Sequence, residues 1–425
     1  MLTAAVFFPL IGIAAVALLP QRREAMTRAV AAAFAAVPLV LLLVAWARFD
    51  TGRRGFQLVE SADWIPTLGV GYRVGVDGIS LPLAVMSALL FVGAVVYPAD
   101  LRGRARQYFA CFLFLETVSV GLFLALDLFL FYVFFDLSLV GMYFLIGVWG
   151  HGDARRSALK FFLYTLAGSL VMLLAIIGLY LATDPRTFDM ARIIRQQPFA
   201  EGGVGAGLVF AGFAIGFAIK TPLVPFHTWL PPAHVDAPAP ASAILAGVLL
   251  KMGTYGFVRI LLQMMPDTFR VWAPWLGIAA VVSIVYGALV ALAQTNLKRL
   301  VAYTSVNHMG YVILGVAAAG ALASGERDAR TLALTGATVE MVAHGLITGA
   351  LFLLSGSVWQ RAETYEIGEL GGLASRAPLF TGAMVLAAFA SFGLPALAGF
   401  VAEFQIFTGA FSVYPVLAGV GLLGI

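Results

Sequence analysis

The feature that most constrains this chain is a succession of apolar segments, each about as long as a membrane-spanning helix. Short polar or proline- and glycine-rich connections separate one segment from the next. A helix of about 20 apolar residues crosses the hydrocarbon core of a bilayer. Only 11% of the residues are charged, whereas a soluble domain carries about 25%. These properties predict an all-α polytopic membrane protein and exclude a soluble, fibrous or disordered chain.

The predicted spans number about 12, and a shorter thirteenth segment of about three turns follows them. The sequence stops within that last segment, so we expect the chain to be a fragment of a longer protein. The segments lie at about 2–20, 29–47, 78–98, 108–126, 127–149, 160–182, 204–230, 240–263, 272–294, 300–323, 331–358, 377–411 and 415–425.

The sequence lacks the motifs of several other functional classes. A single cysteine, Cys111, lies inside an apolar segment, which excludes a disulfide framework, an iron–sulfur cluster and a cysteine zinc site. No glycine-rich nucleotide-binding motif is present. His227 and His234 lie in a proline-rich turn, and their separation is not a typical ligand spacing. We therefore predict no metal site and expect these two histidines at the surface or in a helix cap.

Two predicted spans are interrupted near the middle. The segment 204–230 contains Lys-Thr-Pro-Leu-Val-Pro at 220–225, and the segment 377–411 contains Gly-Leu-Pro-Ala-Leu-Ala-Gly at 393–399. A proline inside a helix costs about 3 kcal/mol unless the freed backbone groups find other partners. An ordinary kink explains one such break. A pair of breaks several spans apart is typical of transporters built from inverted repeats.

Basic residues in the short connections predict the orientation of the chain. Compact clusters at 22–28, 102–106 and 298–299 alternate with connections whose arginines are mixed with acids. Cytoplasmic connections carry the excess of Lys and Arg. We therefore expect the N-terminus on the outer side of a bacterial inner membrane.

Lysine is rare in this chain, and two of the lysines lie near the centre of predicted spans. There are four lysines against 22 arginines. Lys251 lies near the middle of 240–263, and Lys220 lies at the break in 204–230. A buried lysine can release its proton, whereas an arginine cannot. The two lysines therefore indicate groups that titrate, and a structural anchor is the alternative for each.

Acidic residues and histidines accompany these lysines at membrane depth. Asp136 lies at the centre of 127–149, and Glu403 follows the break in 377–411. Each charge inside the membrane costs about 2.5–3.5 kcal/mol, so either mutual pairing or a hydrated path has to compensate. For Asp136 the alternative to a transport role is a structural ion pair with a lysine.

Four further polar residues lie within predicted spans. Glu340 precedes His344 by one helical turn, which puts both on one face. Glu116 and His308 lie in the spans 108–126 and 300–323. Such a series of Asp, Glu, Lys and His residues at membrane depth is typical of a proton relay. Purely structural roles remain open for all four.

Four stretches of the sequence resemble the antiporter-like subunits of respiratory complex I. They are FHTWLPPAHVDAPAPASAILAGVLLKMGTYGFVRI (226–260), NLKRLVAYTSVNHMGYVILG (296–315), MVAHGLITGALFLLSG (341–356) and GLPALAGFVAEFQIFTGAF (393–411). The segment LDLFLFYVFFDLSLVGMYFLIGVWG (126–150) resembles the M-subunit (chain 4) branch of that family. Glu403 points to the same branch, because the L and N subunits carry a lysine there. The resemblance covers nearly the whole chain.

The resemblance implies an antiporter-like fold of fourteen helices with two inverted five-helix repeats, each containing a broken helix. Residues 1–107 would hold the first three helices, residues 108–263 the first repeat, and residues 264–425 the second, incomplete repeat. The implied proton relay consists of Asp136, Lys220, Lys251, His344 and Glu403, with His308, Glu340 and Glu116 as possible further members. Asp136 departs from the family, whose acid is nearly always glutamate, so its reach toward Lys220 is about 1.5 Å shorter.

The function that the resemblance implies is proton translocation, driven by the transfer of electrons from NADH to quinone in other subunits. NADH, flavin, iron–sulfur clusters and quinone would bind to those subunits, so no cofactor and no redox site are expected in this chain. The expected partners are the L-type and N-type subunits of the complex and the lipid bilayer, without nucleic acid.

Other functions remain open from the residues. One is a subunit of a multisubunit cation/proton antiporter or of a membrane-bound hydrogenase, although the amino-acid sequence of residues 228–253 favours complex I. Another is a scaffold subunit that does not pump and whose buried charges form structural pairs only. A membrane glycosyltransferase would need a large loop with paired carboxylates, and the connections in this chain are too short.

Overall fold

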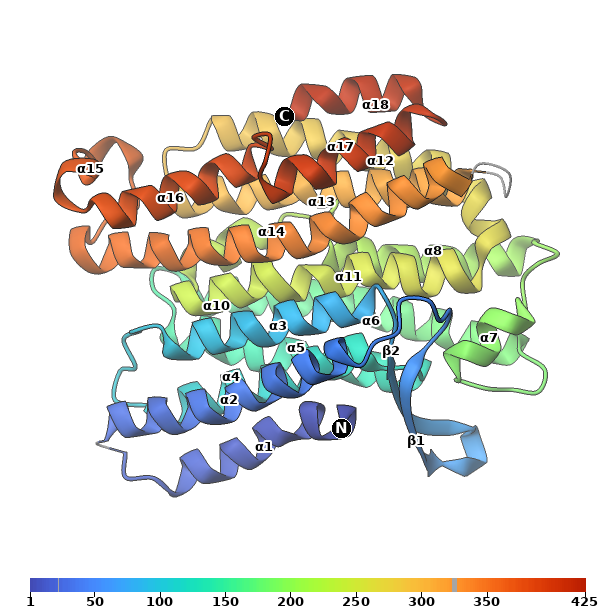
Figure 1. Cartoon of the computed structure of the whole chain (residues 1–425), viewed down its shortest axis with the longest axis horizontal. Coiled ribbons are helices and arrows are strands. Elements are labelled where there is room, and N and C mark those ends of the chain that lie inside the picture. Colours follow the sequence, from blue (N-terminus) through green and yellow to red (C-terminus); the bar gives the residue numbers. More distant parts are fainter. Residues whose placement is uncertain (22, 323–326) are drawn as a thin grey trace. The chain divides into compact units, whose positions relative to one another are not determined.

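The computed structural model describes residues 1–21, 23–322 and 327–425, which are mostly helical (Figure 1). Arg22, on which part of the orientation prediction rests, and the last residue of the predicted span 300–323 lie outside the described residues. The chain divides into two compact units. The first comprises residues 1–199, 203–216 and 236–244, and the second comprises residues 200–202, 217–235 and 245–425.

The first unit is a helical bundle with one β-hairpin. Its elements are α1 (Leu2–Leu18), α2 (Glu24–Ala47), β1 (Gln57–Ile65), β2 (Val70–Val76), α3 (Ser80–Val96), α4 (Ala105–Leu124), α5 (Leu128–Trp149), α6 (Ala154–Ala182), α7 (Met190–Gln196), most of α8 (Val204–Lys220) and α10 (Ala239–Ile244). The strands pair in antiparallel register, with Ala62 opposite Tyr72. Neither the hairpin nor α7 is predicted by the apolar pattern, because both lie in the connections between spans.

The second unit contains the remaining helices. They are α9 (Leu230–Asp236), the π-helical turn η2 (Leu245–Leu249), α11 (Leu250–Gly256), the π-helical turn η3 (Phe257–Leu262), α12 (Pro266–Leu292), α13 (Leu297–Ala321), α14 (Arg327–Ala362), α15 (Leu373–Arg376), α16 (Pro378–Ser391), α17 (Ala398–Phe411) and α18 (Pro415–Gly421). In this unit α13 packs against both α12 and α14, and α17 packs against α14 (Figure 1).

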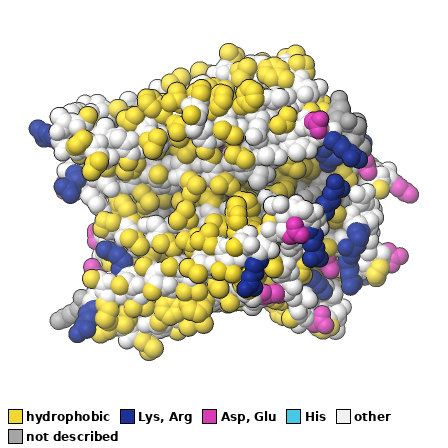
Figure 2. All heavy atoms as spheres, in the orientation of Figure 1, with side chains coloured by type: hydrophobic (Ala, Val, Ile, Leu, Met, Phe, Trp, Pro, Cys, Tyr) yellow, Lys and Arg dark blue, Asp and Glu magenta, His cyan; other side chains and the backbone are white. Residues whose placement is uncertain are grey.

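The membrane class and the helical architecture predicted from the sequence are confirmed. Eight of the described helices are long and apolar enough to span a membrane, and six shorter apolar helices accompany them. On the face drawn in Figure 2, hydrophobic side chains cover the middle of the helices, whereas Lys, Arg, Asp and Glu gather near the helix ends. The number of repeats and the three-part division of the chain stay predictions.

Both predicted breaks are present in the structure. Helix α8 ends at Lys220, directly before the stretch that contains Pro222 and Pro225. The second break separates α16 from α17, between Ser391 and Ala398. Proline has no backbone N–H to donate, so neither stretch continues the helical hydrogen bonding. Each broken span thus places helix ends inside the apolar region.

One contact of the hairpin anchors the start of α1. Glu60 on β1 accepts hydrogen bonds from the backbone N–H groups of Leu2 and Thr3, and it also pairs with the Met1 ammonium. Burial opposes the charge of this carboxylate, but these hydrogen bonds prevail and lower the pKa of Glu60 from 4.5 to about 2. The folded pKa is below the unfolded one, so the stabilisation is complete above about pH 4.5 and is lost as the pH falls toward 2.

Candidate functional site

Lys251 lies in the most deeply buried stretch of the second unit. It belongs to α11, which is flanked by the π-helical turns η2 and η3, and its side chain is 0% exposed. Its Nζ donates a hydrogen bond of 2.6 Å to the carbonyl oxygen of Ala246, within η2. π-Helical turns are rare and change the register of the backbone hydrogen bonds. The helix therefore provides a backbone acceptor for its own buried amine.

The second partner of Lys251 is His344 on α14. Nζ of Lys251 lies 2.5 Å from Nδ1 of His344. Nδ1 of His344 also lies 3.2 Å from Oγ1 of Thr348. Two positive charges at that separation would repel each other strongly in a dry interior, so at least one of the two groups has to be neutral. An amine and an imidazole can each carry the proton, so a proton can be transferred between Lys251 and His344 across this contact.

His308 on α13 extends this pair toward two carboxylates. Its ring centroid is 5.2 Å from that of His344. Its Nδ1 lies 3.1 Å from Oε1 of Glu340 and 3.9 Å from Oε1 of Glu403. The exposed fractions of His308, Glu340 and Glu403 are 6%, 1% and 4%. We refer to these three residues as the two-carboxylate cluster.

Titratable groups from several helices thus form one continuous series in the second unit. The series runs from Lys251 on α11 through His344 on α14 to His308 on α13, and it ends at Glu340 and Glu403. Glu340 and His344 both face the His308 ring, as their spacing of one turn predicts. Such a series can pass a proton stepwise without any cofactor.

The break between α16 and α17 positions two of the polar partners of His308. Ser391 is the last residue of α16, and its Oγ lies 3.0 Å from Nε2 of His308. Glu403 lies on α17, beyond the break. Within the break Gly393 has a φ of +65°, which favours glycine. A Cβ atom there would collide with the Glu403 carboxylate, so the break also provides the space for this acid.

Replacing Gly393 by alanine is expected to destabilise the protein and displace Glu403. The positive φ costs about 1–3 kcal/mol for a residue with a Cβ, and the collision adds to it. The midpoint of thermal unfolding of the purified protein measures the effect. Gly382→Ala is the matched control, because a Cβ at that position of α16 meets no atom within 4 Å. Equal midpoints for both variants would contradict this account of the break.

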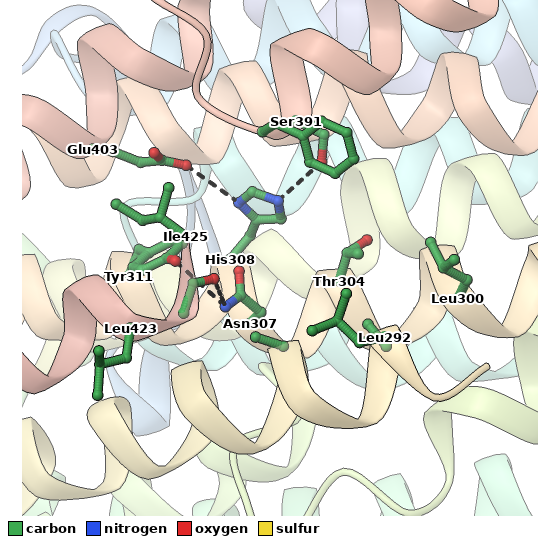
Figure 3. Close-up of a pocket in the computed structure, with 14 residues that line it drawn as sticks. Leu292, Leu300, Thr304, Asn307, His308, Tyr311, Ser391, Glu403, Leu423 and Ile425 are labelled. Atoms are coloured by element: carbon green, nitrogen blue, oxygen red, sulfur yellow. Dashed lines mark hydrogen bonds and ion pairs between the residues drawn. The ribbon is translucent and has the colours of Figure 1, made fainter.

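A cavity of about 210 Å³ opens beside the two-carboxylate cluster. His308 and Glu403 line it, together with Asn307, Tyr311 and Ser391 (Figure 3). Figure 3 shows His308 between Glu403 and Ser391, with dashed contacts to both. A cavity of this size with polar groups on its wall holds several water molecules. The carboxylate end of the series therefore adjoins a space that is large enough for water.

Lys220 lies at the other break, where its side chain is 1% exposed. The chain after it packs closely on α11: a Cβ at Gly253 would lie 2.8 Å from the backbone nitrogen of Thr221 and from the carbonyl oxygen of Phe217. Only a glycine permits this approach. Lys251 is two residues from Gly253, so the first break and α11 meet near both lysines.

Asp136 and Glu116 belong to the first unit. Asp136 on α5 is partly buried, and the hydroxyl of Tyr132, one turn earlier, hydrogen-bonds to it. Glu116 on α4 is 0% exposed, and neither of its carboxylate oxygens has a hydrogen-bond partner among the described residues. The structure therefore places both acids on helices of the first unit, whereas the series around His308 belongs to the second.

The surface position expected for three residues is wrong, whereas the alternative of a helix cap stays open for His227 and His234. His227 and His234 are 6% and 0% exposed, so neither is a surface residue. The His234 ring stacks on Phe352 at a centroid distance of 4.6 Å. Lys298, assigned to a basic surface cluster, is 0% exposed, with its amine over the ring of Tyr365. His227 packs on Tyr286. Each of the three residues thus contacts an aromatic side chain from a distant part of the sequence.

Two hydroxyl groups of the site were not predicted. Thr348 is one turn after His344, and that spacing could have identified it as a partner. Ser391 is 83 residues from His308 in the sequence. No local pattern relates the two, so only the packing of α16 on the second unit reveals Ser391.

Comparison with known proteins gives one family. Residues 125–423 match the profile described as NADH:quinone oxidoreductase/Mrp antiporter, transmembrane region. The chain is 39% identical over 410 residues to NAD(P)H-quinone oxidoreductase chain 4 1 of Picosynechococcus sp., covering 96% of this chain and 74% of that protein. It is 38% identical over 382 residues to NADH-quinone oxidoreductase subunit M of Rickettsia prowazekii, covering 89% of this chain and 74% of the relative.

A solved structure agrees with these relatives. A chain of respiratory complex I from Thermus thermophilus with bound NADH superposes on this chain with a TM-score of 0.88 and 33% sequence identity. The alignment covers 100% of this chain and 85% of that one. The likeness therefore extends over the whole described fold.

Proposed function

The chain belongs to the NADH:quinone oxidoreductase/Mrp antiporter transmembrane family, and on that premise we propose that it is the M-type (chain 4) proton-translocating subunit of a respiratory quinone oxidoreductase. Other subunits of the complex would transfer electrons from NADH to quinone. This chain would contribute the membrane path for protons, and the complex as a whole would be the enzyme, a proton-translocating quinone reductase.

The observation that carries this proposal is the closely spaced series of buried titratable groups in the second unit. From Lys251 to His344 the separation is 2.5 Å, and from His308 to Glu340 it is 3.1 Å. The gap between the two histidine rings is 5.2 Å from centroid to centroid, a distance that a rotated ring or one water molecule bridges. A subunit that served only as a scaffold would need no such series between its helices.

The Lys251–His344 contact accounts for directional control of the proton. While the proton is on Lys251, His344 is neutral and accepts a hydrogen bond from the amine. When the proton moves to His344, that ring becomes a cation 5.2 Å from His308. Its charge repels a proton already held by His308, which then moves to Glu340 or Glu403 and leaves His308 free to accept the next proton. The two carboxylates hold the proton beside the cavity until it leaves.

The first unit supplies the electrostatic input in this proposal. Asp136, at the position of the family acid, would attract the proton of Lys220, and movement of that charge would alter the protonation of Lys251. Glu116 is a buried acid with the same capacity to accept a proton. In the same proposal the chain has L-type and N-type neighbours, and other subunits hold the cofactors. A bacterial inner membrane and an outward N-terminus stay predictions, the latter from the Lys and Arg bias of the connections.

Isolation of the complex from the source organism tests the proposal. An affinity tag on this chain is expected to recover L-type and N-type subunits together with NADH:quinone reductase activity. Recovery of cation/proton antiporter subunits without that activity would contradict the assignment and favour the Mrp side of the family. A tag on an unrelated polytopic membrane protein serves as the control for nonspecific recovery.

A further inference from the structure

The two-carboxylate cluster combines ligand types that a metal ion requires. One nitrogen of His308 and one oxygen each of Glu340 and Glu403 all lie within 4.8 Å of one another. The three residues come from α13, α14 and α17, so the packing of three helices holds them together. They are at least 94% buried, and bulk water therefore competes little for the ligand atoms.

The cluster is not satisfied by its own contacts. The second oxygen of Glu340, Oε2, is buried and has no hydrogen-bond partner among the described residues. Glu403 contributes a second carboxylate, 3.9 Å from Nδ1 of His308. Burial makes it costly for two carboxylates this close to be ionised together without a balancing cation. Protons supply that balance in the relay, and a divalent cation would supply it as well.

His308 is oriented as a metal-binding histidine would be. Its Nε2 lies 3.0 Å from Ser391 Oγ, while Nδ1 faces the two carboxylates. A histidine that ligates a metal uses its other ring nitrogen to donate a hydrogen bond, which fixes the tautomer. With Nε2–H donating to Ser391, the lone pair of Nδ1 points to the position between Glu340 and Glu403.

We propose that His308, Glu340 and Glu403 form a binding site for a divalent transition-metal ion of the Zn²⁺ type. One imidazole and two carboxylates match the nitrogen and oxygen ligands of zinc, and water from the adjoining cavity completes a tetrahedral set. The cavity beside Glu403 gives the ion a way in. Calcium and magnesium fit less well, because both prefer sites made of oxygen alone.

Metal bound here would act as an inhibitor of proton transfer, a consequence that rests on the proposed function. The ion would occupy Nδ1 of His308 and neutralise both carboxylates, so the series would lose its terminal acceptors. Binding of the ion itself depends only on the geometry of the cluster. The two statements can therefore fail separately.

The test measures zinc bound to the purified complex that contains this chain. The complex is stripped with a chelator, equilibrated with micromolar Zn²⁺ and analysed for metal content after gel filtration. Glu340→Gln is expected to weaken one site on the order of 100-fold and to lower the content by one zinc per complex. Glu116→Gln, which changes a buried carboxylate of the first unit that has no hydrogen-bond partner among the described residues, should leave the content unchanged.

X-ray absorption at the zinc edge gives an independent readout on the unmodified complex. The difference spectrum between the unmodified complex and Glu340→Gln should show nitrogen and oxygen ligands at about 2.0–2.2 Å. Equal zinc content in both proteins would overturn the proposed site. Zinc bound as expected, without any loss of proton pumping, would support the site and contradict the relay.

Discussion

Replacing Glu403 by glutamine is expected to lower proton pumping by about tenfold or more, while the complex still assembles. Glutamine keeps the size of the side chain and its place beside His308, but it cannot bind and release a proton. Glu403 is the carboxylate of the cluster that lines the cavity, so its loss removes the proton acceptor at the cavity end of the series. The measurement is the initial pumping rate in proteoliposomes, normalised to assembled complex on native gels.

The control for this substitution is Glu369→Gln, at an exposed position near η4 (Ile367–Glu369). It makes the same chemical change outside the buried series and should leave pumping unaltered. Glu340→Gln is expected to have a smaller effect than Glu403→Gln, because Glu403 still faces His308 after that change. Unchanged pumping in Glu403→Gln would remove this residue from the path.

The second large effect is expected at Asp136. Asp136→Asn should reduce pumping by about tenfold or more, because the amide carries no charge to attract the proton of a lysine. Asp136→Glu should retain pumping, since the family carries glutamate at the corresponding position and the longer side chain reaches about 1.5 Å further. Together the two variants show whether pumping requires an acid at this position or an acidic side chain of one particular length.

A carboxylate at the surface provides the comparison for Asp136. Asp153 is 68% exposed in the connection before α6, and Asp153→Asn should pump normally. Pumping that survives in Asp136→Asn would assign this acid a structural role. Pumping lost in both Asp136→Asn and Asp136→Glu would mean that the local packing around Tyr132, rather than charge, limits the rate.

The sequence predicts best those features that depend on the covalent structure of a residue and on its near neighbours. The helix ends at Lys220 and Ser391 could be predicted, because proline and glycine interrupt helical hydrogen bonding wherever they occur. The buried position of Lys251 also follows from the sequence, since it lies near the middle of an apolar segment. These properties depend on a residue and its near neighbours alone.

Contacts between distant segments could not be predicted in the same way. The one-turn spacing of Glu340 and His344 places them on one face, but only the packing of α14 on α13 brings Glu340 to His308. His234 was expected at the surface because prolines surround it, and Phe352 buries it instead. The π-helical turns beside Lys251 likewise leave no periodic signal, since one extra residue in a buried helix does not change the apolar pattern.

The most direct test of the central claim is the number of protons moved per electron pair in proteoliposomes that contain Lys220→Ala or Lys251→Ala. Lys160→Ala, at an exposed position of α6, is the control for loss of a lysine. If the buried series conducts protons, both variants assemble and reduce quinone, but the ratio of protons to electrons falls well below that of the control. Normal ratios in both assembled variants would contradict the account and leave the buried charges as structural pairs.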